Sequence, residues 1–146
     1  NKTMASTVFK SLTDTTFDSV EGYRQAAETA NNPQLTQALQ QRGQERGQTL
    51  QQMNAELQRQ GEELVTKGTL TGEAHQMWQS VTAAFENNDE AAAERVEEGE
   101  DYIKNKFQQA LESDQLEVQE RAVVQQAYSE ICAGERFGDF AAKQFD

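Results

Sequence analysis

The stretch Glu94-Arg95-Val96-Glu97-Glu98-Gly99-Glu100-Asp101-Tyr102 decides the fold, because it places one acid on the apolar face of a helix. At about 100° per residue, that face is formed by Ala92, Val96, Ile103, Phe107 and Ala110. Glu100 falls in the middle of this apolar stripe, whereas the neighbouring acids turn away from it. A carboxylate in a core is costly unless another group pairs with it or binds it. The sequence therefore predicts a packed helical core that holds a partner for Glu100.

The composition of the 146 residues favours a single all-helical domain. Proline occurs once, strand-like alternation is absent, and Ala, Gln, Glu and Leu dominate. The formal net charge of −12 argues against nucleic acid or an anionic membrane as a partner, because binding to either needs basic patches. No apolar run reaches the ~18 residues of a membrane span and no signal peptide is visible, so we expect a cytoplasmic protein. The single cysteine, Cys132, rules out an intramolecular disulfide.

Apolar periodicity predicts four long helices and one short one. The long helices are expected at about 6–30, 33–60, 89–112 and 114–134, and the short helix at about 69 or 71 to 85. Asn32 suits an N-cap and Pro33 the first position of a helix. Asp114, with Glu117 three residues later, resembles a capping box at the start of the last helix.

Residues 134–146 form an aromatic C-terminal tail that contains Phe137, Phe140 and Phe145. We expect this tail to fold onto one end of the helices. A homodimer contact and a mobile tail are the alternatives. Residues 1–146 are therefore expected to form one domain that ends in this tail.

The short third helix sets the expected topology. At 1.5 Å per residue, about 15 residues span roughly 22 Å, which is enough to carry the chain from one end of a bundle towards the other. We therefore expect an all-α, ferritin-like four-helix bundle, with up-down pairs joined by a crossover that contains a short fifth helix. In this topology the helices that start at Pro33 and Asp89 run parallel, so Arg46 and Glu100 lie at one level.

A structural polar layer is the expected role of the residues at that level. Arg42 and Arg46 occupy the middle of an otherwise apolar stripe, and Glu21 and Tyr128 reach nearly the same layer from the first and last helices. The planar guanidinium fork bonds a carboxylate at two points. We expect Arg42 or Arg46 to pair with Glu100, assisted by Glu21 or Tyr128.

Two smaller features of the sequence also predict packing. Gly43 and Gly47 lie beside the inward arginines, and two glycines in a helix suggest close approach of a neighbouring helix. His75 and Trp78 lie one turn apart, and we expect a half-buried imidazole that packs beside the indole. A metal ligand or general base is the alternative interpretation of His75.

A metal centre is the alternative interpretation of the core. Ferritin-like folds often hold two metal ions between Glu residues and Glu-x-x-His motifs. The chain lacks Glu-x-x-His, and inward arginines would repel a divalent cation, so we expect no cofactor. The acids available to iron or another divalent metal are Glu21, Glu28, Glu45, Glu97 and Glu100. No nucleophile with its base, phosphate-binding glycine loop or zinc motif is visible, which argues against catalysis.

Three segments carry a family resemblance: Gly22-Tyr23-Arg24 with Ala26-Ala27-Glu28, then Gly72, His75 and Trp78, then Glu97, Gly99, Glu100 and Asp101. In this order and spacing they resemble a bacterial ferritin-like four-helix-bundle family of unknown function. Its members often have a histidine on the last helix, where this chain has Tyr128, and that departure lowers the expectation of a metal centre. The resemblance implies the fold but no activity. Since some ferritin-like relatives are associated with stress, we expect a non-catalytic protein with a structural or stress-related role.

Overall fold

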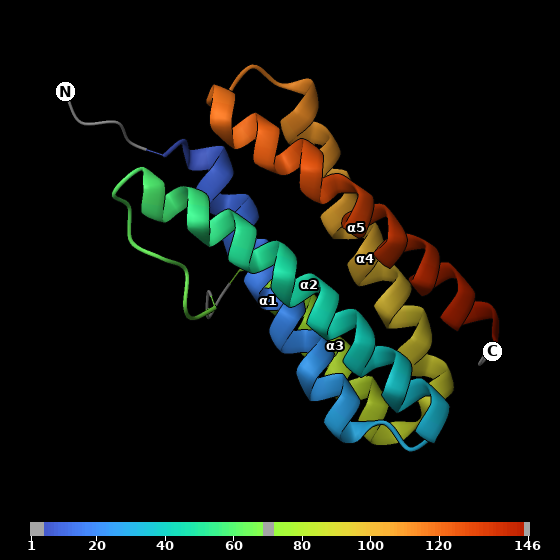
Figure 1. Ribbon diagram of the computed structural model, residues 1–146. Coiled ribbons are helices and arrows are strands. Elements are labelled where there is room, and N and C mark those ends of the chain that lie inside the picture. Colours follow the sequence, from blue (N-terminus) through green and yellow to red (C-terminus); the bar gives the residue numbers. More distant parts are fainter. Residues whose placement is uncertain (1–4, 69–71, 145–146) are drawn as a thin grey trace.

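Five helices make up the described part of the chain in the computed structural model (Figure 1). The structure describes residues 5–68 and 72–144. The helices are α1 (Thr7–Thr29), α2 (Pro33–Arg59), α3 (Glu73–Asn87), α4 (Asp89–Glu112) and α5 (Val118–Gln144). The described residues include no strand, so the prediction of an all-helical chain is confirmed.

The helices pack as two antiparallel pairs with α3 against them. α1 packs on α2 and α4 packs on α5, while α3 contacts both α1 and α4. In Figure 1, α2 and α4 run in one direction and α1, α3 and α5 in the other. The parallel course of α2 and α4, predicted from the short third helix, brings the midpoints of these two helices to one level.

Asparagines cap the helices at the two predicted breaks. Oδ1 of Asn32 accepts hydrogen bonds from the backbone N–H groups of Gln34 and Leu35, and Oδ1 of Asn88 accepts one from Ala91. These bonds satisfy donors that the first turn of a helix leaves open. A side-chain oxygen of Asp89 also accepts from the backbone of Asn32 at 2.7 Å, which ties the turn between α1 and α2 to the start of α4.

The predicted start of the last helix is wrong. The capping box expected at Asp114 and Glu117 is displaced by three residues, because Oε1 of Glu120 accepts a hydrogen bond from the backbone N–H of Glu117 at 2.9 Å. α5 accordingly begins at Val118. The short helix α3 begins at Glu73, later than predicted, and the positions expected to start it lie outside the described residues.

The end predicted for the last helix at Gly134 is also wrong, because α5 continues to Gln144. Glycine weakens an isolated helix, but Gly134 and Gly138 sit at close contacts with α4, and packing outweighs propensity there. The expected tail is therefore mostly helix. Phe137 packs on the core, Phe140 is 61% exposed, and Phe145 lies outside the described residues.

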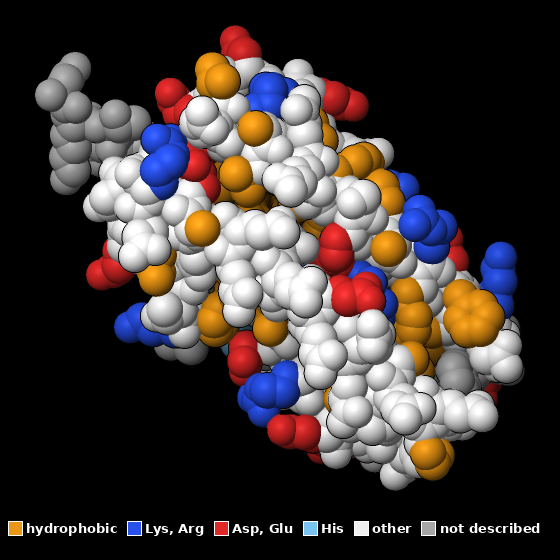
Figure 2. All heavy atoms as spheres, viewed as in Figure 1, with side chains coloured by type: hydrophobic (Ala, Val, Ile, Leu, Met, Phe, Trp, Pro, Cys, Tyr) orange, Lys and Arg blue, Asp and Glu red, His pale blue; other side chains and the backbone are white. Residues whose placement is uncertain are grey.

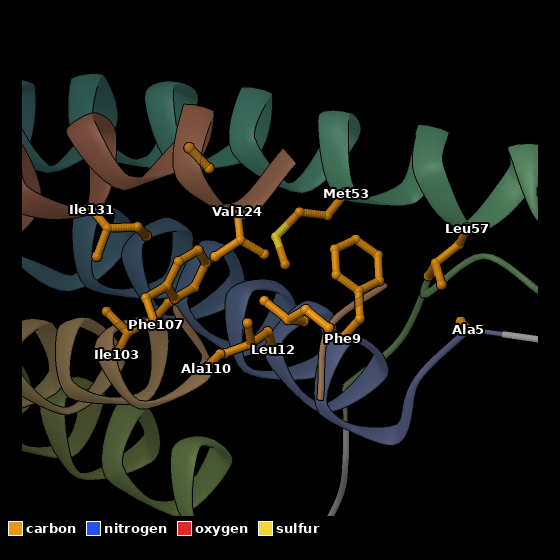
Figure 3. Packing of buried hydrophobic residues seen from close by; sticks show 12 residues of the cluster. Ala5, Phe9, Leu12, Met53, Leu57, Ile103, Phe107, Ala110, Val124 and Ile131 are labelled. Carbon is orange, nitrogen blue, oxygen red and sulfur yellow. The ribbon is translucent and has the colours of Figure 1, made fainter. Parts of the chain in front are cut away.

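Two apolar clusters form the core, one at each end of the bundle. Figure 3 shows the first, in which Phe9 of α1, Met53 of α2, Phe107 of α4 and Val124 of α5 point toward one another. The second gathers around Tyr23, Trp78 and Phe85. Along α2 and α4, Arg46 and Glu100 fall between the residues of the two clusters. Within the described ranges, no helix combines the length and apolar character needed to cross a membrane.

Candidate functional site: a buried arginine–carboxylate network

A buried ion pair links α2 to α4 at the middle of the bundle. Nη2 of Arg46 donates to both carboxylate oxygens of Glu100, at 2.8 and 3.0 Å, and both side chains are 0% exposed. Nη1 of Arg46 donates to Oγ of Ser19 at 3.0 Å, and Nε donates to Glu130 at 2.9 Å. One guanidinium thus joins α1, α2, α4 and α5, and the pair expected from helix register is in place.

The phenol of Tyr23 is the second donor to Glu100. Its hydroxyl hydrogen-bonds Oε2 of Glu100, and its ring centroid lies 4.9 Å from that of Trp78 and 6.4 Å from that of Phe137. Burial raises the pKa of Tyr23 well above its usual value, and the negative charge of Glu100 raises it further. The phenol therefore stays protonated and serves only as a neutral donor to the carboxylate.

The network continues from the core to the surface through Glu130 and Arg42. Oε1 of Glu130 accepts from the hydroxyl of Thr49 at 2.7 Å, and Oε2 pairs with Arg42. Arg42 also pairs with Glu45, which reaches solvent. Acidic and basic side chains accordingly lie together in the middle of the face that α2 and α5 form (Figure 2). Two guanidinium groups are compensated by the carboxylates of Glu45, Glu100 and Glu130.

The charge of Arg46 is maintained despite its complete burial. Burial by itself would lower the pKa of Arg46, but the carboxylates of Glu100 and Glu130 outweigh it and raise the pKa above its ordinary value. Hydrogen bonds between charged groups are stronger than neutral ones, and a buried pair is tolerated when its remaining donors are satisfied. The core therefore holds a cation where a metal site would need room for one.

The three segments that carry the family resemblance meet at Trp78. A Cβ atom at Gly22 would lie 2.4 Å from the indole, and one at Gly99 would lie 2.9 Å from it. Trp78 is almost fully buried and also contacts Tyr23, the donor to Glu100. Both glycines therefore make room for an indole that supports the network, which gives these segments a packing role.

Two predicted members of the polar layer are wrong. Tyr128 packs against the first apolar cluster, and Glu21 pairs at the surface with Arg24. Tyr23 and Glu130, each two positions away, take the places expected for them. The reason is rotational, because two residues turn a helix face by about 200°. Tyr23 lies in the apolar stripe of its helix, at the level of Glu100. That position in the sequence could have identified its phenol as a partner of Glu100.

The five acids considered as metal ligands are not brought together. Glu28 pairs with Arg24 at the surface, Glu45 with Arg42, and Glu100 with Arg46. Glu97 lies beside Asp139 of α5. Among the described residues, the group whose ligand atoms lie within 4.8 Å of one another is Asp101, Glu135 and Asp139, which shares no member with the predicted set.

The glycine prediction for α2 is right at one position and wrong at the other. A Cβ atom at Gly43 would lie 3.3 Å from Cβ of Tyr23, which is a close approach, whereas one at Gly47 would meet nothing within 4 Å. Gly134 of α5 lies directly against the ion pair, because a Cβ atom there would lie 2.4 Å from both Nη2 of Arg46 and Oε2 of Glu100. The absence of a side chain at Gly134 is therefore what lets α5 close over the ion pair.

The arrangement favours charge compensation over chemistry on a substrate. Both oxygens of Glu100 accept hydrogen bonds inside the protein, and so do both oxygens of Glu130. His75 lies elsewhere, with Nδ1 3.9 Å from Oδ1 of Asp18. The carboxylates of the network have their acceptor capacity used by arginine, tyrosine and threonine, so none of them presents an open ligand position to the core.

A protein family matches most of the chain. Its description is "Domain of unknown function (DUF2383)", and it matches residues 4–113, which is more than half of the chain and covers α1 to α4. No curated protein matches the chain, and no solved structure matches it either. The match thus includes Tyr23, Arg46 and Glu100 but not Glu130.

Proposed function

Since the chain belongs to the DUF2383 family, whose description names no activity, we propose a function from its own residues. The protein is a non-catalytic, ferritin-like bundle in which an internal ion pair occupies the position of a metal centre. Its role is structural or stress-related. The observation that carries this proposal is the guanidinium of Arg46, which is fully buried and bonded to both oxygens of Glu100.

The ferritin-like topology is part of the same proposal. Its support is the parallel course of α2 and α4 between two antiparallel pairs, with α3 on the connection (Figure 1). On this proposal residues 1–146 form one cytoplasmic bacterial domain, as a monomer or a homodimer. Neither a nucleic acid nor a membrane is a partner, which the net charge of −12 supports.

An internal arginine changes what the fold can bind. A divalent cation at the level of Glu100 would lie against a guanidinium whose positive charge is not screened by water. Binding it would require Arg46 to leave a site where its donors contact Ser19, Glu100 and Glu130. Breaking these bonds and moving a fully buried guanidinium is the costly step, and it opposes metal binding.

Metal analysis tests the proposal. Protein purified without chelator should contain no stoichiometric iron, zinc or manganese, and anaerobic titration with ferrous iron should give no saturable binding. Iron at one or two ions per chain, lost in Glu100→Gln and kept in Glu98→Gln, would contradict it. That result would establish the alternative, a di-iron carboxylate oxidase or iron-handling protein. Glu98 is the matched control because it lies on the exposed side of α4.

A further inference from the structure

A second polar site lies where α1, the start of α3 and the middle of α4 meet. Three carboxylates, those of Asp14, Asp18 and Glu73, line a pocket of about 300 Å³ there. The volume is at the lower end of the range usual for small-molecule sites. The other lining residues are Ser11, Thr15, Gly72, Ala74, Tyr102 and Lys106. Neither side chain of the central ion pair is among them, so the pocket is separate from the buried network.

The carboxylate of Asp14 has no partner within the described part of the chain, since neither a hydrogen bond nor an ion pair holds it. Burial raises the pKa of Asp14, and none of the described cations offsets that effect. Lys10, which precedes it by one turn of α1, is directed instead to Glu62 at 3.2 Å. Asp14 is therefore a partly buried acid whose charge the protein leaves uncompensated.

Thr15 is a second and independent sign of a ligand. Its side chain lines the pocket and is 9% exposed, so more than nine-tenths of it is buried. The hydroxyls of Thr13 and Thr16 donate to backbone carbonyls at 2.8 and 2.7 Å, whereas Oγ1 of Thr15 bonds to none of the described residues. This oxygen is not sealed in the core, because the described side-chain atoms enclosed without a partner are Nε of Arg42 and Oε1 of Gln60. The hydroxyl is therefore open to the pocket as an acceptor for a donor that the protein does not provide.

Tyr102 of α4 brings an aromatic ring to the pocket. Its hydroxyl donates to Oε1 of Glu73 at 3.1 Å, and Nζ of Lys106 lies over the ring, 5.4 Å from its centroid. Burial raises the pKa of Tyr102 to about 12, together with the hydrogen bond to Glu73 and the negative charges of Glu73 and Asp18. The charges of both acids thus act on this ring, and the position of Lys106 shows that the ring accepts a cation on its face.

The arrangement suits an extended dication better than a single metal ion. The lining holds three carboxylates and one ammonium group, so it has an excess of two negative charges. A metal ion needs ligand oxygens that converge, and among the described residues those that converge within 4.8 Å belong to Asp101, Glu135 and Asp139. The acids of the pocket lie farther apart than that. Two separated ammonium groups match both their spacing and their charge.

We propose that this pocket binds a small aliphatic diamine. One ammonium group of the ligand donates to the carboxylate of Asp14 and to the hydroxyl of Thr15, and the other lies against Glu73 and the ring of Tyr102. Asp18 adds negative charge to the same pocket. The site is one of binding, so it goes beyond the structural role of the central network and does not depend on it.

Isothermal titration calorimetry with 1,4-diaminobutane tests this proposal. At neutral pH and constant ionic strength, the diamine should bind saturably, with one molecule per chain. Butylamine keeps one ammonium group and should bind about tenfold more weakly, whereas 1,4-butanediol has the same length and no charge and should not bind. Absence of saturable binding, or equal affinity for butylamine, overturns the proposal. So does displacement of the diamine by magnesium at one ion per chain, which would identify a metal site.

An aspartate variant with a matched control separates a local contact from net charge. Asp14→Asn should weaken binding of the diamine about tenfold, the value of one lost charge contact near 1.4 kcal/mol. Asp114→Asn removes an exposed aspartate outside the pocket and should leave the affinity unchanged. Equal loss in both variants would mean that only net charge matters, which contradicts the proposal.

The hydroxyl and the lysine are tested in the same titration. Thr15→Val removes the hydroxyl at nearly constant volume and should weaken binding severalfold, whereas Thr16→Val, outside the pocket, should not change it. Lys106→Met should strengthen binding, because it removes a competing ammonium group from the ring of Tyr102. Wild-type affinity in Thr15→Val, or unchanged or weaker binding in Lys106→Met, with circular dichroism like that of the wild type, would overturn the proposal.

Discussion

Glu100 and Glu120 are both 0% exposed, yet the molecule compensates their burial in opposite ways. Glu100, in the middle of the bundle, is bonded to the guanidinium of Arg46 and the phenol of Tyr23. Within the described ranges, Glu120, at one end, accepts only from neutral donors. These are the N–H and hydroxyl of Ser6 at 3.0 and 2.6 Å, the amide of Gln60 at 3.0 Å and the N–H of Glu117 at 2.9 Å.

The partners of Glu100 and of Glu120 represent two ways of holding helices in register. The central carboxylate depends on one charged partner, so loss of that partner leaves a bare charge in an apolar core. At the end of the bundle the compensation is divided among donors from the N-terminal segment, the end of α2 and the start of α5, so no single donor is decisive. The first arrangement concentrates the energy in one pair, and the second distributes it.

The largest effect is therefore expected for Arg46→Ala. Removing the guanidinium leaves Glu100 fully buried without its cation, and the free energy of unfolding should fall by on the order of 3 kcal/mol. Urea denaturation followed by circular dichroism measures it. Arg24→Ala, which removes a surface arginine paired with Glu21 and Glu28, is the control and should cost less than about 1 kcal/mol.

A double variant isolates the part of that loss due to the unpaired acid. Arg46→Met with Glu100→Gln removes both charges, and it should recover more than half of the stability lost in Arg46→Met alone. If the single Arg46→Ala variant lost under about 0.5 kcal/mol, the guanidinium would be solvated and the contrast with Glu120 would disappear.

Adding a methyl group over the ion pair should come next. In Gly134→Ala the new Cβ would start 2.4 Å from both Arg46 and Glu100, so α5 must move or the pair must rearrange, at about 2 kcal/mol. Gly47→Ala is the matched control, because its Cβ meets nothing within 4 Å, and it should stabilise α2 by about 0.5–1 kcal/mol. Thermal unfolding of the two variants should thus move in opposite directions, and a similar shift in both would contradict the role of Gly134.

The same contrast explains what could be predicted from the sequence. Glu100 was identifiable because it interrupts an apolar stripe, and Arg46 because it does the same on a helix of matching register. Glu120 lies in the first turn of its helix, where the helix dipole alone could account for it. Its partners could not be inferred, because Ser6 is 114 positions away and nothing in local spacing connects the two.

The end of α5 shows the same limit. Glycines at 134 and 138 predict a weak helix when only neighbouring residues are considered. The sequence therefore predicts a tail that is not part of the last helix. In the fold, the missing side chains admit the ion pair at one position and the backbone of Glu97 at the other. A glycine required by a neighbour 34 residues earlier in the chain has no local signature, so helix propensity alone ended the helix too soon.

At Glu120 a smaller effect is expected, with a pH dependence that identifies its mechanism. Burial opposes ionisation, but the hydrogen bonds from Ser6, Gln60 and Glu117 outweigh it and lower the pKa of Glu120 below its usual 4.5. The unfolded chain therefore takes up this proton first, so the contribution to stability is present above about 4.5 and is lost as the pH falls through the lowered value. Glu120→Gln should cost about 1–2 kcal/mol at neutral pH.

Chemical denaturation between neutral and acid pH measures that contribution. The difference in stability between wild type and Glu120→Gln should shrink as the pH falls below about 4.5, since the unfolded chain takes up the proton there and the folded carboxyl becomes neutral only at its lowered pKa. A difference that stayed constant with pH would show that the neutral donors stabilise the carboxyl group and not its charge. Ser6→Ala should reproduce part of the loss, because the serine hydroxyl donates to Glu120.

The smallest effect belongs to a third carboxylate, Glu97, whose partner is another acid. A hydrogen bond to Asp139, then partial burial and the charges of Asp139 and Asp101, raise the pKa of Glu97 from 4.5 to about 7, while Lys143 opposes them. The folded state holds this proton more tightly than the unfolded chain does. The stability that Glu97 contributes is therefore present below 4.5 and declines as the pH rises towards 7, the reverse of Glu120.

Melting temperatures across that window should fall in the wild type and stay flatter in Asp139→Asn, where the partner has no charge. A parallel slope in both proteins would show that the two carboxyl groups do not interact. The direction of the pH response would then depend on burial alone and not on the chemical identity of the partner.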